Sequence, residues 1–298
     1  MKILIGIPTF QRPQMLADAL DSLSGQFSDS PLDVLVVDND PALSGRAVAH
    51  SARKNLNLVY MAEASRGVCA VRNRIIDYAE ESGYSAILFI DDDEIAEPEW
   101  FQSMKEAHAK SPLVVFSGPV RYDLGGDCPP SPLQLMVLSR RPPERGRRMT
   151  TTGCGNTLLP LAALAVLSIP RFDESFARSG GEDTDFFTRL SSRGVLISWN
   201  PGAVVCETVP ADRATSRALL ARVERNGQIN GTIARRNHSA MLVFCGGLAR
   251  AALGALELGF RRDRARRTSG RVRFRAGIGY MRAAIGQVAV AYGEGSSE

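Results

Sequence analysis

Residues 86–100, AILFIDDDEIAEPEW, join five apolar residues directly to four acidic ones. The apolar part has the length and continuity of a strand that is buried on both faces. Neighbouring carboxylates repel one another. The stretch therefore predicts a core strand, 86–91, whose end carries an unusual concentration of negative charge.

Strand and helix patterns alternate on both sides of this stretch. The other predicted strands are 3–10, 33–40, 57–61 and 113–120, and the predicted helices are 13–24, 44–53, about 67–82 and 98–109. Continuous apolar strands separated by helices predict an α/β fold, with a parallel sheet that binds ligands at the carboxyl ends of its strands. No GxGxxG follows the first strand and no GxxxxGK[ST] occurs, which disfavours a dehydrogenase or a P-loop protein.

The bulk composition is that of a globular protein. Of the 298 residues, 44% are hydrophobic and 23% are charged. No run of 18 apolar residues is free of charge, so we expect no clean membrane span. The N-terminal apolar stretch is too short for a secretion signal, and the five cysteines, which are odd in number and widely spaced, predict neither a disulfide framework nor a zinc site. These features favour a reducing cytosol.

The charge is unevenly distributed. From residue 211 onward there are 16 Arg and 6 acidic residues, a net charge of +10, whereas residues 1–210 carry −6. We therefore expect a catalytic domain over 1–210 and a helical, Arg-rich extension over 211–298.

The apolar segment 240–260 of this extension contains few charges and is followed by eight Arg between 261 and 275. On a helix, Arg250, Glu257, Arg261 and Arg264 form one polar stripe. This pattern predicts a helix lying at the cytoplasmic face of the cell membrane, with basic residues facing anionic lipid. The alternative is a C-terminal helix packed on the body with a solvated Arg surface.

The stretch 121–150 is rich in Pro, Gly and Arg. We interpret it as a long loop that acts as a lid or binding loop, with a disordered insertion as the alternative. Beyond it, the pattern predicts short helices near 160–167 and over 182–193, and a strand at 195–199.

The acidic run suits a metal ion. In a strand, alternate residues share a face, so Asp91 and Asp93 are expected to point together. Two carboxylates at a strand end suit Mg²⁺ or Mn²⁺, with coordination positions left for a diphosphate. A solvated acidic turn is the alternative.

A second acidic cluster, Glu182, Asp183 and Asp185, follows two glycines at a predicted helix start. The helix dipole keeps such a carboxylate ionised, so that it can accept a proton from a hydroxyl group; an ordinary N-cap is the alternative. Arg66 and Arg72 are candidates for holding phosphate oxygens. Together these groups predict group transfer from a nucleotide-activated donor.

Seven segments in order resemble the bacterial family 2 glycosyltransferases, which have the GT-A fold, a Rossmann-like, mixed but mostly parallel sheet flanked by helices. The segments are IGIPTFQRP, VVDND, AVRNR, LFIDDDE, GPV, GCGNTLL and SGGEDTDFFTRL. SGGEDTDFFT and VPADRAT look most like the succinoglycan-type glucosyltransferases of exopolysaccharide synthesis. The resemblance covers about residues 1–235.

This resemblance implies inverting, metal-dependent transfer of a hexose, with glucose favoured, from a UDP-sugar to a saccharide or lipid-linked saccharide acceptor. Asp183 would be the catalytic base, and Glu182 would orient it or contact the acceptor. Asp93 would bind Mn²⁺ or Mg²⁺, and Asp91 and Asp92 would support the metal or contact the ribose. The remaining donor-binding residues implied are Pro8, Thr9, Phe10, Arg12, Asp38, Asn39, Arg66, Arg72, Gly155 and Asn156.

The sequence departs from the family pattern at two places. Where many members carry a His, this chain has Cys206, a poor ligand for Mg²⁺, so Glu207 is the substitute candidate as third metal ligand. The QxxRW motif of processive synthases is missing, which favours the addition of one sugar per encounter. Arg213 is a further candidate for the diphosphate.

Two other classes of protein stay open at this point. A sugar nucleotidyltransferase uses a similar sheet, but PTFQRPQ lacks the glycines expected after the first strand. A basic-tailed module that binds lipid or nucleic acid would explain the arginines, but it would explain neither acidic cluster, and the tail has few aromatic residues for base stacking. No nucleic-acid partner is expected.

Overall fold

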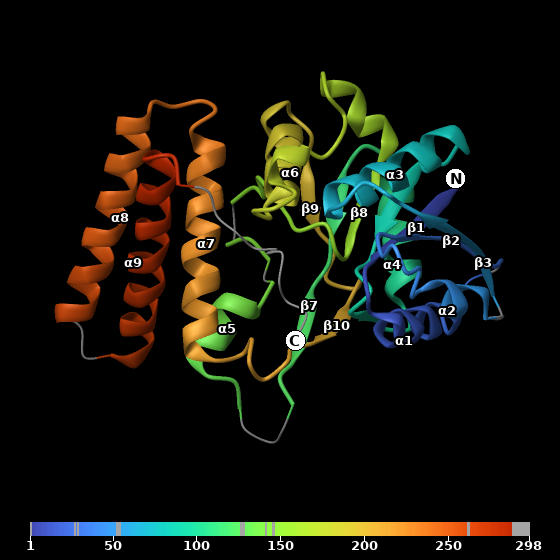
Figure 1. Cartoon of the computed structure of the whole chain (residues 1–298), viewed down its shortest axis with the longest axis horizontal. Coiled ribbons are helices and arrows are strands. Elements are labelled where there is room, and N and C mark those ends of the chain that lie inside the picture. The colour runs from blue at the N-terminus through green and yellow to red at the C-terminus, as the bar shows by residue number, and fades with distance from the viewer. Residues whose placement is uncertain are drawn as a thin grey trace. The chain divides into compact units, whose positions relative to one another are not determined.

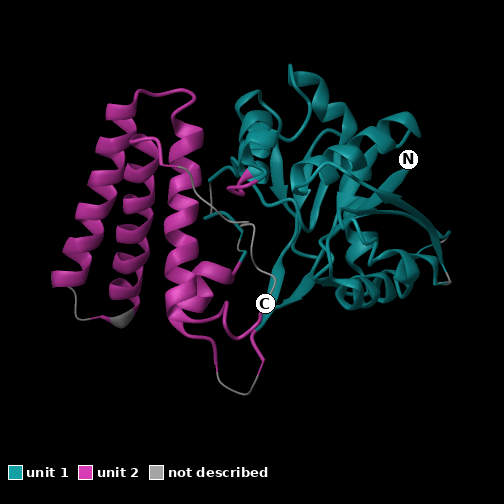
Figure 2. Ribbon diagram, viewed as in Figure 1, with its two compact units in different colours: residues 1–123, 140–177, 182–208 teal, residues 124–139, 178–181, 209–298 magenta. Residues whose placement is uncertain are grey.

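The computed structural model divides the chain into two compact units (Figure 2). The residues it describes are 2–26, 28, 30–51, 55–125, 129–140, 142–144, 147–260 and 263–287. Unit 1 comprises 1–123, 140–177 and 182–208, and unit 2 comprises 124–139, 178–181 and 209–298. Unit 2 therefore contains two short segments from within the first 210 residues as well as the C-terminal helices.

Unit 1 is built on a seven-stranded sheet with the strand order β3-β2-β1-β4-β8-β6-β9 (Figure 1). Its strands are β1 (Ile3–Thr9), β2 (Leu32–Asp38), β3 (Leu56–Ala62), β4 (Ala86–Phe89), β6 (Val115–Ser117), β8 (Thr157–Pro160) and β9 (Ile197–Trp199). Strand β8 runs antiparallel to β4 and β6, and the other pairings described in this sheet are parallel. The predicted mixed but mostly parallel sheet is confirmed.

Helices cover both faces of this sheet. The helices of unit 1 are α1 (Pro13–Ser24), α2 (Arg46–His50), α3 (Val68–Glu81), α4 (Trp100–Lys110) and α6 (Glu182–Ser192). Because side chains alternate along a strand, the sheet supports two separate cores. Ile5 of β1 packs in one core with Trp100 of α4, while Leu4 packs in the other with Ile75 of α3 and Phe186 of α6.

A smaller sheet follows the carboxyl end of β4. It has the order β5-β10-β7 and consists of β5 (Glu94–Ala96), β10 (Val205–Thr208) and β7 (Val120–Asp123). Strand β5 is antiparallel to β10, which runs parallel to β7. The acidic run therefore lies where the chain leaves the large sheet and enters the small one.

The segment 113–150 differs from the sequence prediction. The single strand expected at 113–120 is two, β6 and β7. The expected long loop contains helix α5 (Pro132–Leu138), which begins at a capping box: the Ser131 hydroxyl accepts from the Gln134 N–H at 3.3 Å and the Gln134 side chain accepts from the Ser131 N–H at 2.8 Å. This reciprocal cap, with Pro132 in the first turn, is a known helix start, so the interpretation of 121–150 as one loop was wrong.

Three long helices make up most of unit 2: α7 (Ser216–Ala234), α8 (Ala240–Phe260) and α9 (Arg264–Ala284). Helix α9 packs against both others and lies between them (Figure 1). Glycines allow the close approach. A Cβ atom at Gly279 of α9 would lie 2.0 Å from the Glu224 carbonyl oxygen of α7, and one at Gly254 of α8 would lie 2.5 Å from the Phe274 nitrogen of α9.

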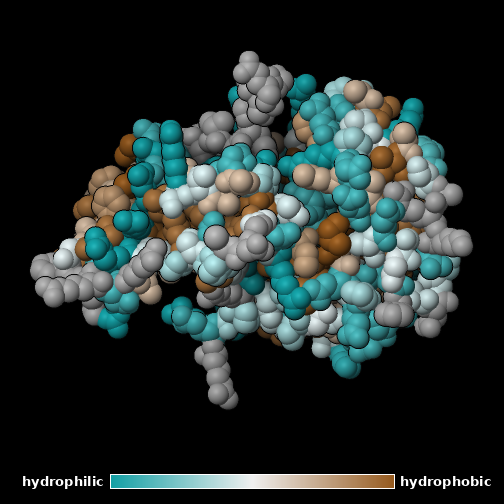
Figure 3. All heavy atoms as spheres, turned by 90° about the horizontal axis from the view of Figure 1, so that it is seen from below, coloured by the Kyte–Doolittle hydropathy of each residue, from teal (hydrophilic) through white to brown (hydrophobic). Residues whose placement is uncertain are grey.

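Most of the surface of helix α8 is apolar and exposed. Its buried face is narrow and includes Val243 and Ala251, whereas six large apolar side chains are between 38% and 77% exposed: Met241, Leu242, Phe244, Leu248, Leu253 and Leu256. Figure 3 shows hydrophobic residues on the surface of unit 2. By length and composition alone, residues 240–259 could cross a membrane, although the segment contains Arg250 and Glu257 and is therefore not a charge-free run.

The predicted polar stripe on this helix is only partly described. Arg250 and Glu257 lie on α8, and they contact α9 through Tyr280 and Arg273 respectively. Arg261 lies outside the described residues, and Arg264 begins the next helix. The one continuous stripe expected from 250 to 264 is therefore wrong, because the helix ends at Phe260.

Candidate functional site

The acidic run forms a turn rather than the end of a strand. Strand β4 ends at Phe89, and the Glu94 N–H donates to the Asp91 carbonyl oxygen at 3.1 Å, which closes the turn. In return, the Asp91 N–H donates to a Glu94 carboxylate oxygen at 3.0 Å. The prediction that Asp91 and Asp93 lie on one face of a strand was therefore wrong, because both residues lie in the turn. Each carboxylate of the run has different neighbours.

Two of these carboxylates bind residues at the end of β1 and just after it. The Thr9 hydroxyl donates to Asp92 at 2.8 Å. The Arg12 guanidinium lies 3.2 Å from an Asp92 oxygen and 2.8 Å from an Asp93 oxygen. Asp92 is buried, and burial, opposed by Arg12, raises its pKa to about 6. Arg12 and Thr9, both predicted as donor-binding residues, thus hold the acidic turn in place.

Arg72 joins the two acidic clusters. This side chain of α3 is buried, with its Nη1 atom 2.5 Å from a Glu182 oxygen and its Nη2 atom 3.4 Å from an Asp91 oxygen. Burial alone would lower the pKa of Arg72, but Cys154, Glu182 and Asp91 raise it well above the ordinary value. Two acidic segments about ninety residues apart in sequence therefore contact the same buried guanidinium group.

Asp183 lies beside Glu182 in the first turn of α6 and accepts from the Thr184 N–H at 2.6 Å. Its other carboxylate oxygen would lie 3.5 Å from a Cβ atom placed on Gly153. The same Cβ atom would lie 2.1 Å from a nitrogen of Arg140. Glycine at 153 thus leaves room for a cation next to Asp183.

Gly155 leaves room in the same way around the acidic turn. A Cβ atom there would lie 2.6 Å from an Asp91 oxygen and 2.8 Å from a Glu94 oxygen. Arg140 donates to the Gly155 carbonyl oxygen at 2.5 Å. The described residues therefore bring together Asp91, Asp183, Arg72, Arg140 and the turn before β8 that includes Gly155.

Sequence reasoning missed two of these groups. Glu94 was counted in the acidic run but given no role, although it is buried and its carboxylate accepts from the Asp91 N–H. Arg140 lies in the Arg-rich stretch that we interpreted as a loop. Its position beside Gly153 depends on tertiary structure, so no local signal could have singled it out from the neighbouring arginines.

Two residues predicted to bind the donor make hydrogen bonds within the protein. The Asp38 carboxylate is 1% exposed and accepts from the N–H groups of Asp40 and Gly45 and from the Tyr60 hydroxyl. Both amide hydrogens of Asn39 are used by the carbonyl oxygens of Glu63 and Ser65. These bonds fix both side chains at the carboxyl end of β2, and their contact with the donor stays a prediction.

Other predicted residues at this edge differ in accessibility. Phe10 is 47% exposed and Pro8 is partly exposed, so both can contact a ligand. Arg66 is exposed and makes no side-chain hydrogen bond within the described part of the chain. Asp40, which was not predicted, accepts from the Ala42 N–H. Hydrogen bonds to its carboxylate lower its pKa, and the largest effect comes from the Ser44 side chain.

Asn156, predicted to bind the donor, makes several hydrogen bonds within the protein. It is fully buried, it accepts from the Trp100 indole at 2.8 Å, and it donates to the Pro119 and Ala203 carbonyl oxygens at 2.8 Å each. Its φ of 50° places it in the left-handed region. These bonds fix the chain next to Gly155 where it enters β8, and contact of Asn156 with the donor stays a prediction.

The other two predicted ligands lie elsewhere along the chain. Glu207 of β10 is directly opposite Glu94 of β5 in the small sheet, so its backbone is next to that of the acidic run. Arg213 is exposed and belongs to unit 2.

The donor set of the acidic turn fits a divalent cation. The pKa of Asp92, of Asp93 and of Glu94 is raised, primarily by burial, and the negative charge of Asp91 adds to the effect at each of them. A bound Mg²⁺ or Mn²⁺ would offset both the burial of charge and the repulsion. Among the residues that the structure describes, no three His, Cys, Asp or Glu side chains are arranged to hold a metal on their own.

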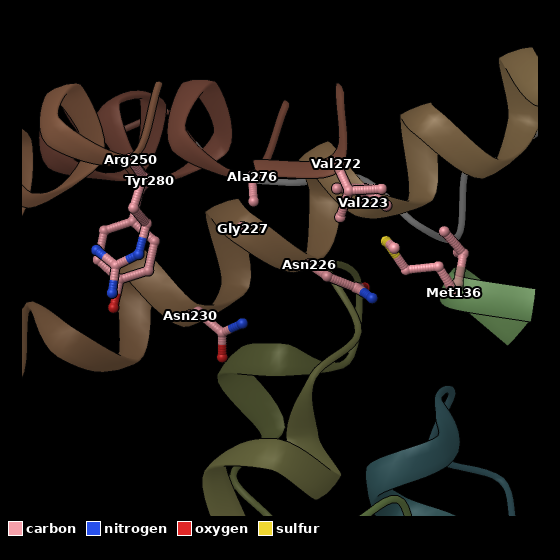
Figure 4. A pocket seen from close by; sticks show the side chains of 10 residues that line it. Met136, Val223, Asn226, Gly227, Asn230, Arg250, Val272, Ala276 and Tyr280 are labelled. Carbon is pink, nitrogen blue, oxygen red and sulfur yellow. The ribbon is translucent and has the colours of Figure 1, made fainter. Parts of the chain in front are cut away.

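Unit 2 has hollows of its own, and one of about 380 Å³ lies over α7 and α9. Figure 4 shows Asn226 and Asn230 of α7 on its wall and the Arg250 guanidinium against the ring of Tyr280, 4.4 Å from the ring centroid. The described lining contains no carboxylate. The described lining of this hollow therefore offers no group that could act as the acid or base of a transfer reaction.

Comparison with known proteins agrees with this fold. The sequence profile of the family "Glycosyl transferase family 2" matches residues 4–164. The succinoglycan biosynthesis protein ExoM of Rhizobium meliloti (strain 1021) is 32% identical over 237 residues, which are 78% of this chain and 75% of that protein.

Solved structures share the fold at low sequence identity. The mannosyltransferase PcManGT from Pyrobaculum calidifontis, in complex with GDP-Man and Mn²⁺, has a TM-score of 0.63 at 16% identity and covers 95% of this chain and 86% of its own. TarS 1–349 of S. aureus in complex with UDP has a TM-score of 0.56 at 18% identity, with coverage of 96% and 92%. A longer TarS chain is covered over 55% of its length. The chain belongs to glycosyl transferase family 2 and is a glycosyltransferase with the GT-A fold.

Proposed function

We propose that this enzyme transfers glucose from UDP-glucose, with inversion, to a saccharide or lipid-linked saccharide acceptor in surface or exopolysaccharide biosynthesis. The observation that carries the proposal is the pair of contacts from Arg72 to Asp91 and Glu182, which makes one site of two acidic clusters. The similarity to ExoM, whose name refers to succinoglycan biosynthesis, supports the product class. The UDP complex of TarS supports the donor class.

The donor side of the site is the acidic turn. Asp93 and Asp91 would hold Mn²⁺ or Mg²⁺, with Glu207 as a further candidate, and the donor diphosphate would complete the coordination. When bound, the ion supplies positive charge to the departing diphosphate. Arg140 lies beside Gly153 and Gly155, and its guanidinium suits phosphate oxygens. Pro8 and Phe10, which are accessible at this edge of the sheet, would contact the base.

The acceptor side is the start of α6. Asp183 would take the proton of the acceptor hydroxyl while that oxygen attacks the anomeric carbon, and the bond from this carbon to the diphosphate oxygen breaks to release UDP. One displacement of this kind inverts the configuration. Glu182 is held by Arg72, and its second carboxylate oxygen is buried with no hydrogen-bond partner among the described residues. That oxygen is suited to accept from a second acceptor hydroxyl.

The exposed apolar face of α8 supports contact with a membrane surface. Six large apolar side chains are exposed on this helix. A membrane-spanning position is disfavoured because α8 packs against α9, whose arginines would enter the hydrocarbon at about 2.5–3.5 kcal/mol each. An interfacial position buries the apolar face and keeps the arginines next to anionic head groups. We propose that this places the enzyme on the cytoplasmic face of the membrane, close to a lipid-linked acceptor.

Replacing the base should stop transfer without preventing donor binding. In Asp183→Asn, we expect kcat to fall at least about 100-fold, because the amide cannot accept the acceptor proton. The affinity for UDP, measured by calorimetry with Mn²⁺, should stay within about threefold of the wild type, since Asp183 is not a donor ligand. Asp18→Asn, an exposed aspartate of α1, serves as the matched control. Near-normal turnover in Asp183→Asn would remove this residue from the role of base.

Replacing the proposed metal ligand should weaken the metal-dependent part of donor binding. In Asp93→Ala, we expect the gain in UDP affinity on adding Mn²⁺ to fall by about tenfold or more, because one charged ligand is lost. Glu99→Ala, an exposed acid a few residues along the chain, is the control. A Mn²⁺ titration that is unchanged in Asp93→Ala would contradict the assignment.

Charging the apolar face of α8 should weaken membrane binding. We compare Leu248→Asp/Leu256→Asp with Leu113→Asp/Leu196→Asp, whose leucines in unit 1 are similarly exposed, at 50% or more. In flotation with vesicles that contain anionic lipid, the α8 pair should lose binding by about tenfold or more, while the unit 1 pair stays near the wild type. Equal binding of both pairs would contradict membrane contact through α8.

A further inference from the structure

A second hollow in unit 2 is strongly basic. It has a volume of about 560 Å³ and lies between α7 and α9. Its described lining contains four arginines and one acid, a net charge of +3; these residues are Arg217, Arg225, Arg275, Arg282 and Glu224. The transfer reaction proposed above does not use them. We call this hollow the arginine groove.

Glu224 organises two of the four guanidinium groups. Its side chain, on α7, is only 10% exposed, and one carboxylate oxygen lies 2.8 Å from Nη1 of Arg275. Its other oxygen contacts Nη1 of Arg282, so one buried carboxylate binds two arginines of α9. Their side chains remain 47% and 51% exposed. Since a guanidinium carries five N–H donors, each keeps donors beyond the one directed at Glu224.

The base of the groove is closely packed. A Cβ atom at Gly279 would lie 2.0 Å from the Glu224 carbonyl oxygen and 2.6 Å from the Gln228 nitrogen. The two helices therefore approach to backbone contact directly below Arg275 and Arg282. Because the backbone is fixed there and one carboxylate holds both side chains, the two guanidinium groups have a defined spacing in the absence of any ligand.

This arrangement selects a phosphoryl group. Planar N–H forks bind phosphate oxygens in bidentate fashion, and a net charge of +3 matches a ligand with two or more negative charges. A metal cation would be repelled, and a neutral sugar would leave the charge unused. No aromatic side chain is among the described lining residues, so the groove offers nothing for nucleic-acid bases to stack on.

We propose that the arginine groove binds the phosphoryl oxygens of a phosphate or diphosphate ester. Such a group has two sources, a phosphorylated lipid at a membrane surface or a soluble phosphate ester. The proposal concerns a site of unit 2 alone. It stands or falls separately from the transferase chemistry of unit 1.

The first test measures binding of inorganic pyrophosphate to the full chain by calorimetry, in EDTA so that no metal supports a diphosphate in unit 1. The variant Arg275→Gln/Arg282→Gln removes two groove arginines. Its control, Arg271→Gln/Arg273→Gln, removes two charges from the same helix outside the groove lining, and Arg273 is likewise paired with a glutamate, Glu257. We expect the groove variant to weaken binding about 10- to 100-fold, the value of one or two charge-assisted hydrogen bonds, and the control about twofold.

A single variant tests the same groove in case the double variant does not fold. Arg217→Gln leaves the contacts of Glu224 in place and should weaken pyrophosphate binding by about three- to tenfold. Binding of UDP with Mn²⁺ should stay unchanged in the groove and control variants alike, which separates this test from that of the transferase site. Equal weakening in the groove and control pairs, or no pyrophosphate binding by the wild type, would overturn the proposal.

Binding to vesicles distinguishes the two sources of the phosphoryl group. Flotation uses phosphatidylcholine vesicles with and without phosphatidic acid. If the groove pair loses binding to phosphatidic acid more than the control pair does, the source is a phosphorylated lipid. If both pairs lose it equally while only the groove pair loses pyrophosphate, the source is a soluble ester.

Discussion

The buried guanidinium of Arg72 is the interaction on which the site depends. A cation this far from water is costly unless carboxylates surround it, and here Glu182 at 2.5 Å and Asp91 at 3.4 Å do so. One of these carboxylates belongs to the turn that leaves β4 and the other to the first turn of α6. Ion pairs of this kind add little net stability, but they fix position strongly. The constraint therefore sets where the proposed donor side and acceptor side meet.

The rest of the site provides room and charge around that contact. A side chain at 153 or at 155 would displace Arg140 or the carboxylates of the acidic turn from their present positions. Burial and mutual repulsion raise the pKa of several acids in the turn. Without a ligand, keeping these carboxylates ionised therefore costs free energy. A bound metal ion would offset the repulsion among Asp91 and its neighbouring carboxylates. A bound diphosphate would offset the positive charge of the arginines.

The fold was predictable from the sequence to a greater extent than the site. Buried strands and amphipathic helices have periods that a sequence reveals, and the acidic run predicted a cluster of carboxylates after a core strand. The turn geometry of Asp91 and Asp93 was not predictable, because the strand ends at Phe89 through hydrogen bonds that no period encodes. Asn156 fits a donor-binding motif, yet it is saturated by Trp100 and two carbonyl oxygens. Arg140 was missed because only tertiary contacts distinguish it from nearby arginines.

A double-mutant cycle measures the coupling energy between Arg72 and Glu182, the contact that joins the two acidic clusters. The free energy of unfolding is measured by urea titration for Arg72→Met, Glu182→Leu, the double variant and the wild type. Each single variant should lose about 3–5 kcal/mol, because it leaves the other charge buried and unpaired. The double variant should lose less than the sum, by about 2 kcal/mol or more. Additivity of the two single effects within about 0.5 kcal/mol would contradict the account.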